Sequence, residues 1–497
     1  MVDHLDVRRG AYHDSVTLMQ VSRRVGDVDG VSSALVAMGT ELNLEVLAGM
    51  GFAAPDAGPN DLVVAIRATD DDGIRAALAE LEAALAAGSG GGPRRFGTGP
   101  PPRTVRDAVA FGADLAVISV PGEHAYVEAL DALRAGAHVM LFSDNVPLEQ
   151  EVALKREARD AGLLVMGPDA GTAVVAGVGL GFANVVQPGA VGIVAASGTG
   201  AQQLMCLLDD VGIGVSHILG VGGRDLSAAV GGGSTLQALA ALDRDPATEL
   251  IVLLSKPPDP AVADRVRAAA DGLSTPVVTL LLGRGSNDLT SAARAVTEAV
   301  GRTWSDPRWW PAPAERTGRH QEIRGIFAGG TLCDEAMAIV ADALGPVRSN
   351  IPLEPAWTLT DGPDTPGHVF VDFGEDEYTR GRPHPMIDQS LRVERLQAEA
   401  ARPGGRVVLL DVVLGHAAHA DPAAELAPAI ADAIERGDEL AVIVSLCGAA
   451  GDPQDRERQA EAFVDAGASV HLSNAHAARE AVELAGGNVH DRTGGVA

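Results

Sequence analysis

One glycine-rich turn that carries hydroxyl side chains occurs twice in this chain, each time between an apolar strand-like run and a helical segment. The first copy is Ser197-Gly-Thr-Gly200, and the second is Gly329-Gly-Thr331. The first turn of a helix has free N–H groups and the positive end of the helix dipole, and glycine lets an anion approach the backbone closely. Two such helix starts predict one anion, a phosphate group, held between them. The predicted phosphate-binding residues are Ser197, Gly198, Thr199, Gly200, Gly329, Gly330 and Thr331.

The surroundings of the two turns match as well. Each turn is followed by a helix, a loop, a second helix, a strand and an Asp-Pro-Ala sequence, at 259–261 and at 421–423. Taken alone, either turn is also typical of simple helix capping, in which a side-chain oxygen accepts a backbone N–H. The repeated order of elements indicates two copies of one folding unit.

Strand-like and helical segments alternate along most of the chain, which predicts an α/β fold with parallel sheets. Residues 1–87 predict a small α+β domain, followed by a linker rich in glycine and proline at 88–102. Residues 103–188 predict a Rossmann-like domain. The two copies of the repeat fill 189–303 and 320–497, with a second linker, rich in Trp and Pro, between them.

Charge and cysteine content exclude several classes of protein. The 497 residues have a formal net charge of -29, which argues against a nucleic-acid or anionic-membrane partner because both would be repelled. The three cysteines, Cys206, Cys333 and Cys447, are too few and too widely spaced for a disulfide framework or a Cys-x-x-Cys metal site. No apolar run approaches the roughly 18 residues of a membrane span. We expect a cytoplasmic protein that has no bound metal or cofactor.

A set of short motifs, taken together, resembles the FdrA family, which is named for its likeness to acyl-CoA synthetases of the succinyl-CoA synthetase type. The motifs are Gly167-Pro-Asp169, Ala196-Ser-Gly-Thr-Gly200, Gly222-Gly-Arg-Asp225, Ser255-Lys-Pro-Pro258, Gly329-Gly-Thr-Leu-Cys-Asp-Glu-Ala336, Arg382-Pro-His-Pro-Met-Ile-Asp388 and Asp411-Val-Val-Leu-Gly415. The resemblance implies that 103–188 is similar to a CoA-binding domain. It implies that 189–303 and 320–497 are similar to the flavodoxin-like ligase domains of the synthetase α and β subunits, whose two helix N-termini point at a phosphorylated histidine.

The chain departs from the synthetase pattern in two places. The segment 280–288, where the synthetase keeps the phosphorylated histidine, contains no histidine. The opening strand and glycine-rich loop of the CoA-binding domain have no counterpart, and the chain has neither a Gly-x-x-x-x-Gly-Lys-Ser/Thr loop nor a recognisable ATP-grasp segment. The resemblance therefore implies a phosphate site without the phosphohistidine relay.

Such a site suits a reaction in which phosphate or an acyl phosphate is itself a substrate or product. Some members of the FdrA family resemble subunits of an oxamate carbamoyltransferase of allantoin catabolism, which converts oxalurate and phosphate to oxamate and carbamoyl phosphate. The resemblance implies that activity here, with a small carboxylate substrate and additional protein subunits. Two alternatives are an acyl-CoA ligase subunit that works with a separate nucleotide-binding subunit, and a regulatory or scaffold protein that is not an enzyme.

Four basic side chains are candidates for holding the carboxylate or the carbamoyl oxygen of the substrate: Arg224, Lys256, Arg382 and His384. A planar guanidinium suits a carboxylate. Each candidate also has a structural interpretation. Arg224 can pair with neighbouring Asp225, Lys256 can be a solvated loop lysine, and His384 can be part of a rigid turn between two prolines.

Overall fold

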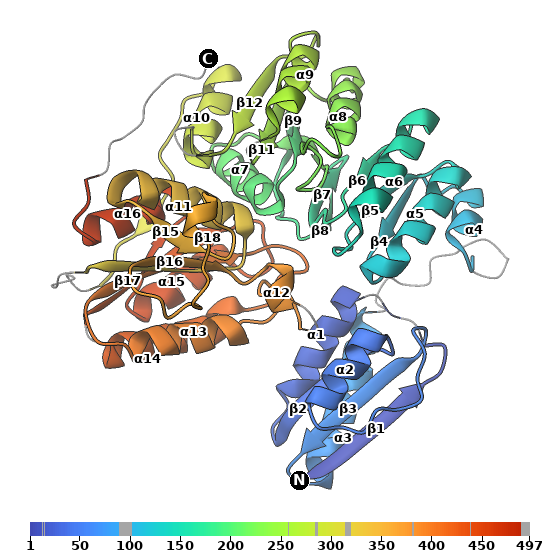
Figure 1. Ribbon diagram of the computed structural model, residues 1–497, viewed down its shortest axis with the longest axis vertical. Coiled ribbons are helices and arrows are strands. Elements are labelled where there is room, and N and C mark those ends of the chain that lie inside the picture. Colours follow the sequence, from blue (N-terminus) through green and yellow to red (C-terminus); the bar gives the residue numbers. More distant parts are fainter. Residues whose placement is uncertain are drawn as a thin grey trace. The chain divides into compact units, whose positions relative to one another are not determined.

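The computed structural model describes residues 1–11, 13, 15–88, 102–256, 258–283, 287–313, 320–379, 382–437 and 439–488. The chain divides into two compact units, which are described separately (Figure 1). The first consists of Met1–Ala113 with Tyr378–Asp388, and the second of Asp114–Glu377 with Gln389–Ala497. Within the described residues, no helix combines the length and the apolar character that crossing a membrane requires.

The first unit is a small α+β domain with a three-stranded antiparallel sheet in the order β1-β3-β2. Its elements are β1 (Val2–Arg8), α1 (Ser15–Gly26), β2 (Val31–Met38), α2 (Glu41–Gly49), β3 (Leu62–Ala68), α3 (Asp71–Gly88) and α4 (Val105–Ala110). Apolar side chains of α1 and α3, including Val25 and Leu81, pack against one face of the sheet, where Ile66 of β3 is buried. The edge strand β1 was missed by the sequence analysis because polar residues interrupt its apolar ones. An ion pair between Asp3 and Arg67, which face each other across β1 and β3, helps to fix its register.

The second unit begins with a parallel sheet in the order β4-β5-β6. Its elements are β4 (Leu115–Ile118), α5 (Gly122–Ala135), β5 (His138–Leu141), α6 (Leu148–Ala161) and β6 (Val165–Met166). Both helices end at a glycine in the left-handed conformation, Gly136 with φ 99° and Gly162 with φ 69°, where a side chain would be strained. The predicted alternation of strand and helix is confirmed here.

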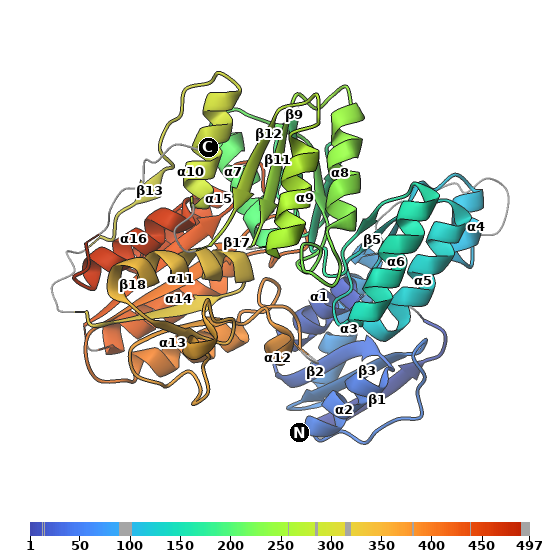
Figure 2. The same ribbon diagram turned by 45° about the horizontal axis from the view of Figure 1, so that its top comes forward.

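The next sheet has the strand order β12-β11-β9-β10-β7-β8. Its elements are β7 (Thr172–Val175), β8 (Val178–Gly181), β9 (Pro188–Ala195), α7 (Gly198–Asp210), β10 (Val215–Gly220), α8 (Gly233–Arg244), β11 (Leu250–Ser255), α9 (Pro260–Ala270), β12 (Val277–Leu281) and α10 (Leu289–Ala299). Helices α8 and α9 cover one face of the sheet, and α7 and α10 cover the other (Figure 2). The hairpin β7–β8 pairs with β10, so this sheet draws on residues that precede the predicted start of the domain at 189.

The last sheet has the order β13-β19-β18-β17-β14-β16-β15. Its elements are β13 (Trp309–Trp310), β14 (Glu322–Phe327), α11 (Gly330–Leu344), β15 (Val347–Ser349), the 3-10 turn η1 (Pro355–Trp357), β16 (His368–Asp372), α12 (Asp376–Thr379), α13 (Ser390–Ala400), β17 (Arg406–Val413), α14 (Pro422–Arg436), β18 (Leu440–Cys447), α15 (Arg456–Asp465), β19 (Ser469–His471) and α16 (Asn474–Leu484). The segment expected to be only a linker contributes β13, which pairs antiparallel with β19. Stacking of Trp309 on His471, with ring centroids 5.4 Å apart, helps to hold this edge strand in place.

The predicted internal repeat appears in the topology of the two sheets. Four parallel strands follow the order β12-β11-β9-β10 in the first and β18-β17-β14-β16 in the second, so β9 and β14 occupy equivalent places. The strand order reverses at these two strands. In open α/β sheets, ligands bind beyond the carboxyl end of the strand where the order reverses. Both glycine-rich turns lie at such an end.

Candidate functional site

The two glycine-rich turns meet. The Oγ of Ser197, which caps α7, lies 2.6 Å from the Oγ1 of Thr331 in the first turn of α11. The backbones are also close, because a Cβ placed on Gly200 would lie 3.0 Å from the Cγ2 of Thr331, and one placed on Gly329 would lie 2.7 Å from the Cγ2 of Thr199. The predicted convergence of the two helix N-termini is confirmed. We call this group of seven turn residues, 197–200 and 329–331, the paired N-termini.

Some donors of the paired N-termini are already engaged and others are not. The Gly329 N–H donates to Asp411 Oδ2 at 2.9 Å, and the Gly200 N–H donates to Ser197 Oγ at 3.1 Å. The helix ladder supplies no acceptor for the N–H groups of residues 198, 199, 330 and 331. The contact between the hydroxyls of Ser197 and Thr331 uses one of their two hydrogens. One O–H and several N–H groups therefore remain to bind an anion.

A buried ion pair holds the second turn in shape. Asp411, on β17, accepts the N–H groups of Ala328 and Gly329 at 2.7 and 2.9 Å, and its carboxylate pairs with Arg392 of α13 at 2.9 Å. Burial raises the pKa of Asp411, although Arg392 and the two N–H groups oppose the shift. Both side chains are at most 2% exposed. In the sequence, Asp411 stands out only as part of the motif Asp411-Val-Val-Leu-Gly415. The signal that could have identified it is a lone carboxylate inside an apolar strand.

Lys256 is the predicted basic residue that the structure brings to the paired N-termini. Its Nζ would lie 3.5 Å from a Cβ placed on Gly330, and it pairs with Asp334 Oδ2 at 2.8 Å. Burial has the largest single effect on Lys256 and lowers its pKa. The neighbouring acidic residues Asp334, Asp372 and Glu375 together outweigh burial, so that the pKa of Lys256 is raised. Lys256 is thus a charged group beside the first turn of α11.

Asp372 lies beside the same turn and was missed by the sequence analysis. Its Oδ2 would be 2.8 Å from a Cβ on Gly330, and its Oδ1 accepts the Gly374 N–H at 2.9 Å. Burial raises the pKa of Asp372 to about 8, so that the carboxyl is mostly neutral at pH 7. The available signal was its position at the end of an apolar strand, directly before a Phe-Gly turn.

Arg224, the second basic candidate, is engaged away from the paired N-termini. Arg224 forms an ion pair with Glu151 at 2.9 Å and donates to the Val146 carbonyl at 2.8 Å. The pairing of Arg224 with Asp225 that the sequence suggested is replaced, because Lys155 bonds both Asp225 and Glu151 at 2.8 Å. Arg224 therefore ties its loop to α6.

Arg382 and His384 lie on Tyr378–Asp388, a segment that belongs to the first compact unit. Arg23 of α1 pairs with Asp388 at 3.2 Å in that unit. His384 accepts the Met386 N–H on Nδ1 at 3.2 Å and the Ile387 N–H on its carbonyl at 2.7 Å. His384 thus forms the tight turn that its flanking prolines suggested. The structure does not join these two residues and the paired N-termini in one compact unit.

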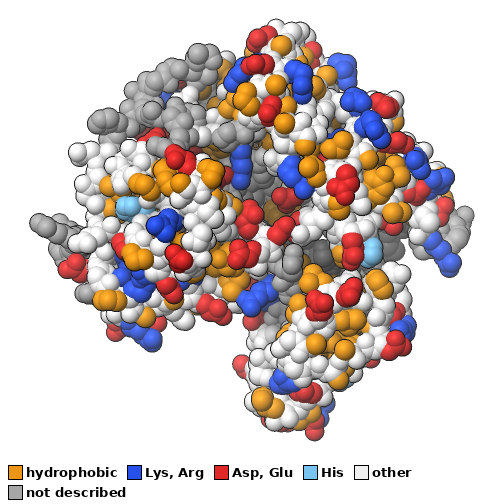
Figure 3. Space-filling view, in the orientation of Figure 1, with side chains coloured by type: hydrophobic (Ala, Val, Ile, Leu, Met, Phe, Trp, Pro, Cys, Tyr) orange, Lys and Arg blue, Asp and Glu red, His pale blue; other side chains and the backbone are white. Residues whose placement is uncertain are grey.

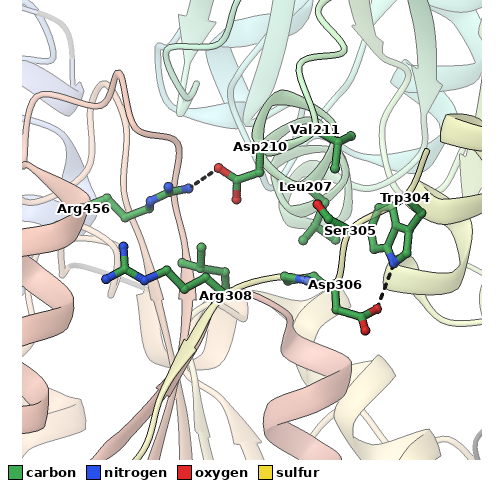
Figure 4. Close-up of a pocket in the computed structure, with 10 residues that line it drawn as sticks. Leu207, Asp210, Val211, Trp304, Ser305, Asp306, Arg308 and Arg456 are labelled. Carbon is green, nitrogen blue, oxygen red and sulfur yellow. Dashed lines mark hydrogen bonds and ion pairs between the residues drawn. The ribbon is translucent and has the colours of Figure 1, made fainter. Parts of the chain in front are cut away.

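A separate cavity of about 200 Å³ lies at the other end of α7 (Figure 4). Its charged lining is already paired: Arg456 contacts Asp210 at 2.7 Å, and Arg308 pairs with Glu457. Its lining residues include none of the predicted site residues. Acidic side chains are spread over the face of the molecule seen in Figure 3, as the net charge of -29 requires.

Gly329, in the second copy of the repeat, faces Thr199 and has no room for a larger side chain. We expect Gly329→Ala to destabilise the protein by about 1–3 kcal/mol, because the added Cβ would press on a β-branched side chain that has little freedom to move. Thr199→Ala should restore part of this stability in the double variant. Thermal melting of the four proteins checks this. Equal melting temperatures for Gly329→Ala and the parent would contradict the close approach of the two turns.

Comparison with known proteins finds two families in this chain. A family model described as CoA-ligase matches residues 326–484, and one described as AllF, heavy metal-associated domain, matches residues 1–96. The α subunit of malate-CoA ligase from Methylorubrum extorquens is 27% identical over 189 residues, which are 36% of this chain and 62% of that protein. An archaeal dinucleotide-forming acetyl-coenzyme A synthetase from Ca. Korarchaeum cryptofilum, in complex with phosphate and ADP, is 18% identical. The two structures match over 75% of this chain and 82% of the synthetase chain. The TM-score is 0.28, which is too low to support an argument.

The first 96 residues do not fit a soft heavy metal. Such metals prefer thiolate ligands, and all three cysteines of the chain lie beyond residue 200. Within the part of the chain that the structure describes, no three His, Cys, Asp or Glu side chains are grouped to hold a metal ion. The residues of the first unit therefore supply no thiolate ligand.

One relative matches nearly the whole chain. The uncharacterized protein YahF of Escherichia coli is 39% identical over 490 residues, which cover 93% of this chain and 94% of that protein. The CoA-ligase match and the repeated parallel sheets show an α/β fold with succinyl-CoA synthetase-like domains. The chain belongs to the same family as YahF.

Proposed function

We propose that this chain catalyses acyl transfer to or from phosphate at the paired N-termini, as the CoA-ligase-like component of an enzyme with further subunits. The observation that carries the proposal is the 2.6 Å contact between Ser197 and Thr331, which brings two helix starts to one place. Each helix start offers N–H groups and a positive dipole end. Together they suit a group with two or more negative charges, such as phosphate.

The proposed chemistry is stabilisation of charge on the phosphate and on the acyl oxygen. N–H groups fixed in helix starts are already oriented toward the anion, so that little reorganisation is needed as charge develops. Lys256 supplies a positive charge from the end of β11, beside Gly330. Holding phosphate and acyl group together replaces a slow encounter in solution by a reaction within one complex.

The favoured acyl acceptor is a thiol, as in CoA ligases. The relatives named as CoA ligase subunits and the match of 326–484 to the CoA-ligase model support this choice. A subunit that binds a nucleotide would then supply the acyl phosphate, because the chain has no recognised nucleotide loop of its own. The three buried, unbridged cysteines fit the reducing cytoplasm, which we propose as its location.

The second candidate is carbamoyl transfer, in which phosphate cleaves oxalurate to oxamate and carbamoyl phosphate, as the FdrA resemblance suggests. The observation that favours it is the lack of any histidine in 280–288, since this reaction needs no phosphohistidine. Phosphate would attack the carbamoyl carbon directly. Both candidates use the same phosphate site. They differ in the atom that exchanges with phosphate at the acyl carbon, which is sulfur in the ligase-type reaction and nitrogen in carbamoyl transfer.

One experiment separates the two candidates. The chain is incubated, alone and with the proteins encoded beside it, in two assays: acetyl phosphate with CoA, followed by thioester formation, and oxalurate with phosphate, followed by carbamoyl phosphate formation. Thioester formation supports the ligase-type reaction, and carbamoyl phosphate supports the second candidate. Turnover in neither assay, with no binding of phosphate by calorimetry, would favour the scaffold alternative.

The isolated chain is expected to bind CoA more weakly than 1 µM, which corresponds to about -8 kcal/mol. The described part of 102–171 forms a sheet of three strands, and a glycine-rich nucleotide loop between a strand and a helix is not among its connections. Calorimetric titration of CoA into the protein measures this. Micromolar binding by the chain alone would contradict the expectation and would strengthen the thiol candidate.

A further inference from the structure

Acyl transfer between phosphate and a sulfur or nitrogen atom moves one proton. When phosphate displaces a nitrogen, a C–O bond forms, the C–N bond breaks, and the departing nitrogen needs a proton while the hydrogen phosphate has one to lose. When a thiol displaces phosphate, a C–S bond forms and the C–O bond breaks. The proton then passes from sulfur to the departing phosphate. A group at the reacting atoms that can give and regain one proton would serve both directions.

We propose that the Asp372 carboxyl carries this proton at the paired N-termini. In the neutral form it protonates the departing atom, nitrogen or phosphate oxygen, and the carboxylate that results takes the proton of the attacking phosphate or thiol. The proton count of the enzyme is then unchanged after each turnover. The inference rests on the proposed function, because it assumes that phosphate binds at this site.

The geometry of Asp372 supports this role. The residue ends β16 and is 3% exposed. Its Oδ1 is fixed by the Gly374 N–H, while its Oδ2 lies against Gly330 in the first turn of α11. No hydrogen bond from the described residues is made to Oδ2. One carboxyl oxygen is therefore anchored, and the other is available next to the N–H groups that would hold the phosphate.

The surroundings keep the carboxyl neutral at pH 7. The charged and titratable groups around Asp372 are Lys256 after β11, Glu375 after β16, Asp411 on β17, Cys333 and Asp334 on α11, and Arg392 on α13. Burial is the main cause of the raised pKa, and the charges of Glu375 and Asp411 add to it. Lys256 opposes the shift but is itself paired with Asp334. A pKa of about 8 lets the group act as an acid near neutral pH and recover its proton afterwards.

Asp372→Asn tests the inference, because asparagine keeps the shape, the neutral charge and the acceptor for Gly374 but cannot exchange a proton. We expect the variant to fold and to bind inorganic phosphate at pH 7 as the parent does. Its kcat in the acyl-transfer assay should fall by at least about a hundredfold, with little change in the KM for the phosphate-bearing substrate, which is acetyl phosphate in one assay and inorganic phosphate in the other. Asp210→Asn, which alters another carboxyl of raised pKa on α7, is the control and should keep its kcat.

The pH dependence gives an independent readout. In the parent protein, infrared difference spectra should show a neutral carboxyl band that disappears as the pH rises through about 8, and this band should be missing in Asp372→Asn. Phosphate affinity of the parent should also fall above that pH, because an ionised Asp372 repels the anion, while that of Asp372→Asn stays level. If Asp372→Asn kept the parent kcat, or kept the band, the inference would be overturned although the phosphate site would stand. If the parent bound no phosphate, the proposed function itself would fail.

Discussion

Replacing Asp411 by alanine is expected to lower the free energy of unfolding by about 3–5 kcal/mol, the largest single effect that the structure implies. The substitution leaves Arg392 as a buried charge without its carboxylate, and it removes the acceptor of two backbone N–H groups in the turn before α11. Unpaired buried charges and unsatisfied donors are both strongly unfavourable.

Urea denaturation followed by tryptophan fluorescence measures the change in the free energy of unfolding with probes that lie in the same part of the chain as the substitution. The four tryptophans of the chain all lie between residues 304 and 357, and Trp309 and Trp310 form the edge strand of the sheet that contains Asp411. The exposed Asp361 provides a matched control, since Asp361→Ala should change stability by no more than about 0.5 kcal/mol. A midpoint for Asp411→Ala equal to that of Asp361→Ala would show that the ion pair does not hold the turn.

The double variant Ser197→Ala, Thr331→Val is expected to weaken phosphate binding by roughly tenfold to a hundredfold, since a charge-assisted hydrogen bond contributes about 1.5–3 kcal/mol. The two hydroxyls are linked at 2.6 Å and together leave one O–H for the anion. Each single variant keeps one hydroxyl that can still donate. The loss in the double variant should therefore exceed the product of the two single losses.

Calorimetric titration with inorganic phosphate measures the three dissociation constants. Thr297→Val is the control, because this buried hydroxyl bonds the Ala293 carbonyl within α10. It should leave phosphate binding unchanged. Unaltered phosphate affinity in all three variants of the turns would mean that Ser197 and Thr331 act only as helix caps, and the phosphate site would have to be sought elsewhere.

The sequence predicted the elements that have strong local signals. Strands such as β11 and β17 are buried along their whole length and consist almost entirely of apolar residues, and the repeated glycine turns marked the two helix starts. Strand β1 and the two-residue strand β13 lie at sheet edges and carry polar or aromatic residues. Their pairing depends on a partner strand far away in the sequence, so that local periodicity could not predict them.

The candidate site was predictable only in part for the same reason. The glycine turns are local motifs, and their predicted meeting is confirmed. Asp372 and Asp411 reach the second turn from strands that lie about 40 and 80 residues further along the chain. Arg382 and His384 belong to a motif of the same family resemblance as the glycine turns, but the segment 378–388 that contains them folds into the other compact unit. Proximity in the sequence was a poor guide to which polar residues surround the turns.

The first compact unit includes one segment from the second half of the chain, Tyr378–Asp388. The residues on both sides of this segment belong to the second unit. The polypeptide thus passes between the two units three times. A gene truncated after residue 113 would encode a domain lacking one of its own segments, and the remainder would retain a loop without its packing partner. Moving residues 1–113 alone would therefore separate this domain from the segment 378–388 that packs in the same unit.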